Sequence, residues 1–178
     1  TLQNGMKVIL KKTDFKDDEI RMTGSSVGGY SQYAVQDPIN SRMMGGIMTL
    51  GGVGNFSATD LPKVLAGKTA SARPNIGLTT QGFSGSSSVK DFETMLQLVY
   101  LYFTSPRKDT DAYKSFLQRT ETQMRNQEAE PMVAFSDSIA QALYGNNPMA
   151  TRLKLNDLKK LDYDRIMEMY KQQFRNPG

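Results

Sequence analysis

The chain has 178 residues, of which 38% are hydrophobic and 22% charged, and its formal net charge is +4. This length and composition suit one globular domain with a packed core rather than a disordered chain. There is no histidine and no cysteine, so the chain has no imidazole base, no thiolate or imidazole metal ligand and no disulfide. Lysine and arginine are scattered among the acidic residues without a basic run, which argues against nucleic-acid binding.

The first part of the chain predicts a β-hairpin. Asn4-Gly5 is a turn signal, and apolar residues alternate with lysines over residues 6–12. That alternation predicts a half-exposed strand. A polar turn over residues 14–18 separates it from residues 19–27, which we expect to form the antiparallel return strand.

Two helices are predicted next. Asp37-Pro38 is typical of a helix start, and Gly51-Gly52 marks the end of that helix. Ser57 is a good N-cap for a second helix over residues 58–66, with Asp60 in the capping-box position. The apolar stripe of the first helix consists of Ile39, Met43, Ile47 and Leu50.

A second hairpin follows, because two extended segments rich in glycine and serine, about residues 68–74 and 78–87, flank Asn75-Ile76-Gly77. Ser88 is then expected to cap a long helix that closes at Pro106.

The rest of the chain predicts three more helices. One runs from about Asp109 to Glu128, one starts at Pro131, and the last is capped by Asp162 and stops at Asn176-Pro177-Gly178. Leu161 and Ile166 have the spacing of a hydrophobic staple at the start of the last helix. The side chains expected to face inward are Phe92, Met95, Leu96, Val99 and Phe103, then Tyr113, Phe116, Leu117, Thr120 and Met124, then Phe135, Ile139, Ala142 and Leu143.

The order of elements predicts an α+β fold, an antiparallel sheet with helices packed on one face. No repeat or linker divides residues 1–178, so we expect a single domain. No apolar run approaches the roughly 20 residues that cross a bilayer, so no membrane insertion is expected. The chain starts at Thr1 without a methionine or a signal peptide, and we expect it to be a fragment of a larger chain.

Two glycine-rich segments resemble catalytic motifs only in part. Residues 82–86 begin like a Gly-x-Ser-x-Gly nucleophile elbow, but the fifth residue is Ser86 and no histidine exists to activate Ser84. A strand running into a helix cap is favoured. Residues 51–54 lack the Lys-Ser/Thr pair of a phosphate-binding loop, and a helix C-cap followed by a turn is favoured.

Acidic and methionine clusters are the remaining candidates. Residues 17–19, Glu128 and Glu130 could ligate a hard cation, but without fixed spacing solvated surface is favoured. Met43, Met44 and Met48 could form an adaptable binding surface, and for two of the three we expect a core position.

Residues 40–56, followed by Asp60-Leu61, resemble the first-helix region of the insulinase/pitrilysin (mitochondrial processing peptidase-like) family of zinc peptidases. In active domains of that family this helix carries His-x-x-Glu-His, followed by a methionine, a short glycine turn, Asn-Phe and an acidic-Leu helix. The opening Leu2-x-Asn4-Gly5-x-x-Val8 and residues 142–148 are also similar to family segments. The residues that match the flanks of the zinc motif are Met48, Gly52, Asn55, Phe56 and Leu61.

The zinc motif itself is absent. Met43 stands at the position of the first zinc histidine, Gly46 at that of the general-base glutamate and Ile47 at that of the second histidine. The third ligand, a glutamate expected near residues 122–124, meets Thr122, Gln123 and Met124, with Glu121 adjacent. We therefore expect no catalytic and no metal-binding residue in this chain, and a former metal pocket filled by side chains.

The resemblance implies a processing-peptidase-like metallohydrolase fold and a role without chemistry. Large bacterial members of the family have a catalytic and a degenerate half that close around an unfolded peptide. This chain resembles the first domain of the degenerate half, and it lacks the strand with which that domain normally continues. The parent is then expected to be a zinc metalloendopeptidase of the bacterial cell envelope or periplasm. Zinc would be bound in its catalytic half, and this domain would contact that half and the peptide substrate.

Two alternatives remain open at this point. The chain could be a stand-alone scaffold or interaction subunit derived from the family. It could also be an enzyme that uses carboxylates or backbone groups.

Overall fold

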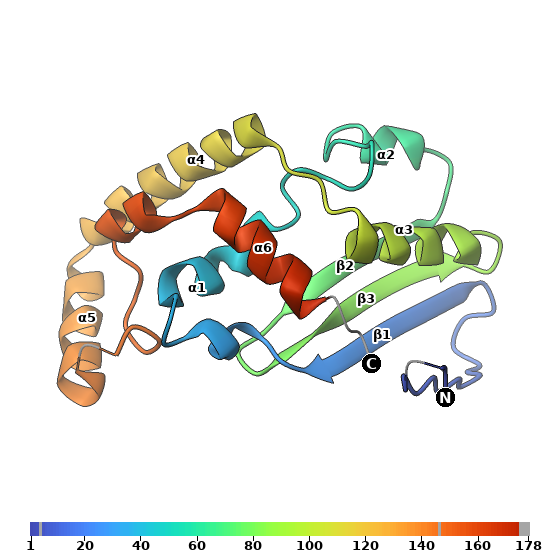
Figure 1. The fold of residues 1–178 in the computed structure, drawn as a ribbon, viewed down its shortest axis with the longest axis horizontal. Coiled ribbons are helices and arrows are strands. Elements are labelled where there is room, and N and C mark those ends of the chain that lie inside the picture. The colour runs from blue at the N-terminus through green and yellow to red at the C-terminus, as the bar shows by residue number, and fades with distance from the viewer. Residues whose placement is uncertain (4, 146, 175–178) are drawn as a thin grey trace.

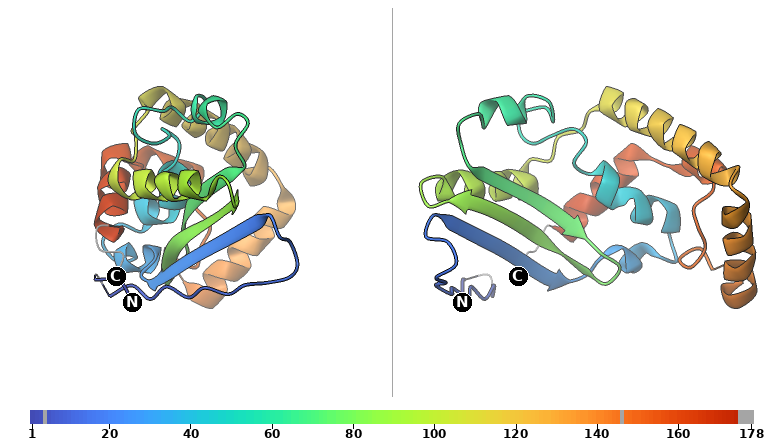
Figure 2. Two further views of the ribbon diagram at one scale, coloured as in Figure 1. Left: turned by 90° about the vertical axis from the view of Figure 1, so that its right-hand side faces the viewer. Right: turned by 180° about the vertical axis from the view of Figure 1, so that it is seen from behind.

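The computed structural model describes residues 1–3, 5–145 and 147–174. Strands β1 (Glu19–Val27), β2 (Ala70–Ile76) and β3 (Thr80–Ser88) form an antiparallel sheet in the order β1-β3-β2. Helices cover one face of this sheet, as Figures 1 and 2 show, and the predicted α+β architecture is confirmed. The helices are η1 (Tyr30–Tyr33), α1 (Pro38–Ile47), α2 (Leu61–Val64), α3 (Phe92–Thr104), α4 (Thr110–Glu128), α5 (Pro131–Tyr144), η2 (Leu155–Lys160) and α6 (Tyr163–Gln173).

The central strand β3 has small residues because its neighbours lie close. A Cβ atom on Gly82 would lie 2.0 Å from the carbonyl oxygen of Gly24 on β1. The alternate residues Gln81, Phe83 and Ser87 are buried under the helices, as the period of two requires. The predicted β2–β3 hairpin is therefore confirmed, and residues 82–86 belong to a strand.

The predicted strand over residues 6–12 is wrong, because residues 6–13 form no strand in the described structure. Val8, Ile9 and Leu10 are exposed. The helix α3 packs on β2 and β3, and most of β1 is exposed. A further strand beside β1 would therefore find little apolar surface to bury against.

Two helix starts also differ from expectation. Ser57 and Ser88 each hydrogen-bond an aspartate three residues later, Asp60 and Asp91, and the helix begins only after that aspartate. Each serine thus closes a turn before the helix rather than capping it, and the helix predicted over residues 58–66 is shortened to α2. Asn4 of the predicted first turn, Asn146 of the family-like segment 142–148 and the predicted helix end at residues 176–178 lie outside the described residues.

Helix α6 lies at the centre of the core. Ile166, Met169 and Tyr170 are fully buried, and they cluster with Met44 and Ile47 of α1. The Tyr170 hydroxyl donates to the carbonyl oxygen of Tyr102 over 2.6 Å. Burial raises the pKa of Tyr170, which keeps the hydroxyl protonated as a donor.

Helices α1 and α6 begin at a shared polar node. Asp37 caps α1, and the side chain of Asn40 donates to the Asp37 carboxylate over 2.9 Å. The Asn40 Oδ1 accepts a hydrogen bond of 2.8 Å from the backbone N–H of Asp162, the N-cap of α6. Arg165 donates to the other Asp37 oxygen over 3.4 Å. Because Asn40 is buried, it joins two helix starts without help from solvent.

Helix α5 contacts the body through its polar side. Asp137 accepts a 3.0 Å hydrogen bond from Arg152, whereas Phe135, Ile139 and Leu143 are exposed. The expected inward side of this helix is thus wrong in the described structure. The helix lies at the end of the molecule away from the sheet (Figures 1 and 2), so its apolar side has no core beside it.

Within the described residues, no helix combines the length and the apolarity that crossing a membrane requires.

The Asn40 node predicts a specific loss of stability. Asn40→Ala leaves the part-buried Asp162 N–H without its acceptor, so we expect the free energy of unfolding to fall by about 1–3 kcal/mol. Urea denaturation measures this change. Asn126→Ala, at an exposed position of α4, has the same gain in helix propensity and is expected to change stability by less than about 0.5 kcal/mol. Equal effects of the two substitutions would contradict the role of the node.

The Asp137–Arg152 pair predicts a pH dependence. The hydrogen bond from Arg152 holds the pKa of the Asp137 carboxyl below its usual value. The unfolded chain, with an ordinary aspartate pKa of about 3.9, then binds more protons in acid than the folded chain. The stabilisation is therefore present above about pH 4 and lost as the pH falls through the folded pKa.

We accordingly expect Asp137→Asn to lower the melting temperature near neutral pH and to converge with the wild type in acid. Thermal unfolding across this pH range checks the expectation. Asp14→Asn, at an exposed position of the N-terminal segment, is the control and is expected to follow the wild type throughout. A constant difference between Asp137→Asn and wild type at every pH would count against the ion pair.

Candidate functional site

The candidate site is the region of α1 and α4 where the family's zinc motif would lie. Helix α1 buries Met44 and Ile47, and it exposes Gly45 and Gly46. A Cβ atom on Gly46 would lie 3.9 Å from the ring of Phe116 on α4. The two helices therefore adjoin at the position where a general base would stand.

The three motif positions have different environments. Ile47 is fully buried in the main core, and the half-buried Met43 packs against the same cluster. Gly46 contributes no side chain. An alkyl group cannot ligate a metal, and zinc takes thiolate, imidazole or carboxylate ligands rather than thioethers. The residues present therefore do not fit a zinc ion.

The corresponding part of α4 offers no free carboxylate. Glu121 accepts a 2.7 Å hydrogen bond from Arg125 one turn later. The Thr122 hydroxyl donates to the carbonyl oxygen of Gln118 within the helix. Gln123 is exposed and Met124 is half-buried. Among the described residues, no three His, Cys, Asp or Glu side chains are grouped so that they could hold a metal ion.

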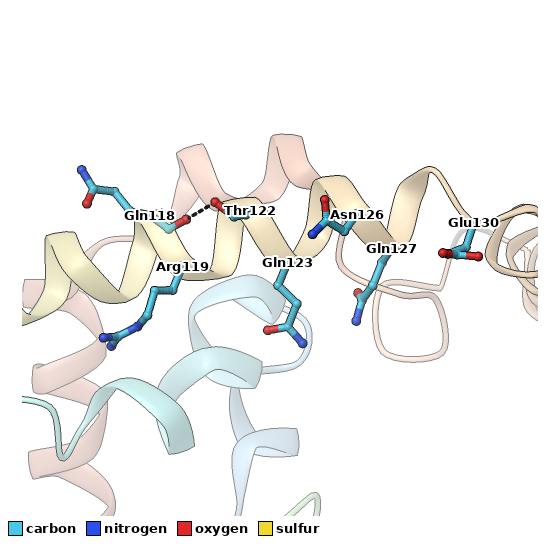
Figure 3. Close-up of a pocket in the computed structure, with 7 residues that line it drawn as sticks. All are labelled: Gln118, Arg119, Thr122, Gln123, Asn126, Gln127 and Glu130. Carbon is cyan, nitrogen blue, oxygen red and sulfur yellow. Dashed lines mark hydrogen bonds between the residues drawn. The ribbon is translucent and has the colours of Figure 1, made fainter.

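An open hollow of about 610 Å³ lies along α4 (Figure 3). Primary amides dominate its lining, and each amide can both donate and accept hydrogen bonds. Such a surface can pair with the backbone of an extended peptide without requiring a particular charge. The residues that line the hollow are Gln118, Arg119, Thr122, Gln123, Asn126, Gln127 and Glu130.

The sequence analysis did not identify this hollow, although the density of Gln and Asn between residues 118 and 127 is a visible signal. Polar residues on a helix are ordinarily read as a solvated face, and only the structure shows that they border a hollow.

Arg42 of α1 has a structural role. Its Nη1 donates to the carbonyl oxygens of Pro148 and Thr151 over 2.6 and 2.8 Å. These contacts hold the segment after α5 against α1. The Arg42 guanidinium is therefore engaged in structural hydrogen bonds beside the motif positions.

The glycine-rich turn after α1 is packed against backbone. A Cβ atom on Gly51 would lie 2.1 Å from the carbonyl oxygen of Arg107, and Gly52 has a φ of +86°. This geometry fits the expected turn and leaves no room for a phosphate at Gly51. Met44 and Met48 are buried in the core, as expected for two of the three methionines.

The acidic residues considered as cation ligands, residues 17–19 and Glu128, have separate environments in the structure. Asp17 and Asp18 are exposed, while Glu19 begins β1 and accepts from Arg21 over 3.2 Å. Glu128 accepts from the backbone N–H of Leu155. These carboxylates therefore serve as surface and local contacts.

No protein-family model matches the chain. The periplasmic protease PqqL from Escherichia coli has the same fold, with a TM-score of 0.83 and 18% identity, over 99% of this chain and 19% of that one. A variant of the ferredoxin protease FusC in complex with Arabidopsis ferredoxin has a TM-score of 0.73 and 14% identity, over 89% of this chain and 17% of that one. The peptidase M16 inactive domain from Pseudomonas fluorescens has a TM-score of 0.61 and 16% identity, over 90% of this chain and 46% of that one. The fold is thus that of an M16 peptidase domain.

A zinc protease PQQL-like protein from Arabidopsis thaliana is 31% identical over 179 residues, which include all of this chain and 16% of the relative. Sequence and fold agree, and the chain belongs to the insulinase-type, or M16, peptidase family. It spans about one sixth of the length of the curated relative that it matches.

The glycine at the general-base position predicts a gain in stability. Gly46 has space for a methyl group, and glycine inside a helix costs about 0.5–1 kcal/mol relative to alanine. We expect Gly46→Ala to raise the free energy of unfolding by that amount in urea denaturation. Gly82→Ala, whose Cβ would meet backbone, is the contrasting variant and is expected to lose about 1–3 kcal/mol. A loss with Gly46→Ala would show that the space beside Phe116 is needed.

Proposed function

We propose that the chain is a non-catalytic domain of a zinc metalloendopeptidase of the M16 family. The observation that carries this proposal is the chemistry of the motif positions. Ile47 is fully buried among apolar side chains, Met43 offers a thioether and Gly46 offers no side chain. A family domain with these residues has no means of holding zinc or activating water.

The comparisons support the proposal in two ways. One structural neighbour is an M16 inactive domain, so domains of this kind exist in the family. Another is a protease in complex with ferredoxin, which supports a protein or peptide substrate for the parent. Because the chain spans about one sixth of its curated relative, there is ample length in such a parent for a separate catalytic half.

In the parent, this domain would form part of the wall around the peptide. Zinc bound in the other half would supply the activated water for peptide hydrolysis. The amide-lined hollow on α4 can hold an extended peptide through backbone hydrogen bonds. Its contribution would be to confine and orient the peptide, which lowers the entropic part of the barrier. The sheet is proposed to gain a further strand in the parent.

A bacterial, periplasmic location of the parent is part of the proposal and rests on the likeness to the periplasmic protease PqqL.

A stand-alone scaffold subunit is the second candidate. The exposed apolar side chains of α5 favour it, because a scaffold presents such surfaces to its partners. The two candidates predict different sequences for the complete polypeptide. A peptidase parent contains His-x-x-Glu-His outside these 178 residues, and a scaffold subunit does not.

The test uses the complete polypeptide and this chain side by side. We expect the complete polypeptide to bind about one zinc ion, to cleave unfolded peptides and to lose activity with a chelator. This chain alone is expected to retain no stoichiometric zinc after dialysis and to cleave nothing, as measured by elemental analysis and a fluorogenic peptide library. Peptide cleavage or tightly held zinc in the 178-residue chain would refute a non-catalytic role.

A further inference from the structure

Helix α5 presents an apolar stripe to solvent. Met132, Phe135, Ile139 and Leu143 recur at intervals of three, four and four residues, which places them on one side of the helix. Their exposed fractions are 69%, 58%, 44% and 68%. Together with Tyr144, which is also exposed, they form the α5 stripe. Contiguous apolar surface of this kind marks an interaction site.

The polarity of α5 is the reverse of that of an ordinary surface helix. Asp137 is its single charged residue, and it is half-buried against Arg152 at 3.0 Å. Val133 and Ala140 share the less exposed side with it. The helix thus turns its charge inward and its large apolar side chains outward, where no part of the described structure covers them.

The orientation of α5 is held by polar contacts at both of its ends. Glu128, just before the helix, accepts from the Leu155 backbone N–H over 3.0 Å. The segment just after it is bound by Arg42 through the carbonyl oxygens of Pro148 and Thr151. The α5 stripe is therefore a preformed surface, which lowers the entropic cost of docking.

We propose that the α5 stripe is the surface through which this domain docks on another domain of the same parent polypeptide. The inference rests on the proposed function only in that the chain is taken as part of a longer peptidase. The relatives leave room for such an occupant, because this chain spans 16% of the Arabidopsis protein and 19% of PqqL. The occupant would present an apolar surface without charge, since the stripe offers no charged group to pair with.

The size of the stripe favours a linked domain over a second copy of the chain. A helix of 14 residues is about 21 Å long. A stripe of that length on a helix about 10 Å in diameter covers roughly 200 Å², far less than the roughly 800 Å² that each partner buries in a stable interface. Covalent linkage supplies an effective concentration in the millimolar range, so a small apolar contact suffices within one polypeptide.

The test is hydrogen–deuterium exchange of the complete polypeptide, carried out on the wild type, on Leu143→Glu and on Gln141→Glu. Leu143→Glu places a charge in the stripe, and Gln141→Glu places the same charge on the side of the same helix that faces away from the stripe. We expect exchange in peptides covering residues 131–144 to rise on the order of tenfold with Leu143→Glu. Gln141→Glu is expected to match the wild type. The milder Phe135→Ser serves if Leu143→Glu does not fold.

Unchanged exchange in both stripe variants would overturn the inference. A concentration-dependent dimer of the wild type that Leu143→Glu dissociates, seen by sedimentation velocity, would also overturn it by naming a second copy as the occupant. Peptidase activity is measured separately on the same samples. An inactive parent whose stripe is protected would refute the proposed function alone, and an active parent whose stripe is unprotected would refute the inference alone.

Discussion

The structure depends on the burial of α6 between α1 and the sheet. Ile166, Met169 and Tyr170 are fully buried there, in one cluster with Ile47 of α1. This packing decides the chemistry of the candidate site, because the residue at the second zinc-histidine position is part of the core. Placing an imidazole at that position would insert a polar ring into a close-packed interior without an assured partner. The packing that stabilises the domain therefore also leaves no zinc ligand at this position.

The helix starts could be predicted from the sequence wherever an aspartate caps the helix directly. Asp37, Asp109 and Asp162 each accept a hydrogen bond from a backbone N–H of the first turn. The prediction failed by about three residues at Ser57 and Ser88, since each serine binds an aspartate that precedes the helix. The serine hydroxyl can bond either to the first turn of a helix or to a nearby aspartate, and the geometry of the turn decides between these two partners.

Periodicity predicted which side of each helix is apolar and could not predict what covers that side. For α4 the side that contains Tyr113 and Leu117 is the one that packs on the core. For α5 and for residues 6–12 the apolar side chains were recognised correctly, yet they are exposed in this chain. In the candidate site the motif positions could be assigned by resemblance to the family, whereas the hollow on α4 depends on how the side chains of residues 118–130 are arranged along one exposed face. A pattern of residue types does not contain that information.

The Asn40 bridge has a consequence for synthesis on the ribosome. Asn40 and Asp162 are 122 residues apart in the chain, and α6 follows the other helices of the described structure. Until α6 has been made, Met44 and Ile47 lack the α6 side chains of their cluster, so a nascent chain that ends after α5 exposes part of its interior. Native contacts of such long sequence separation form slowly, and exposed apolar surface in the interval invites aggregation. The nascent domain is therefore expected to remain prone to aggregation until α6 has been synthesised.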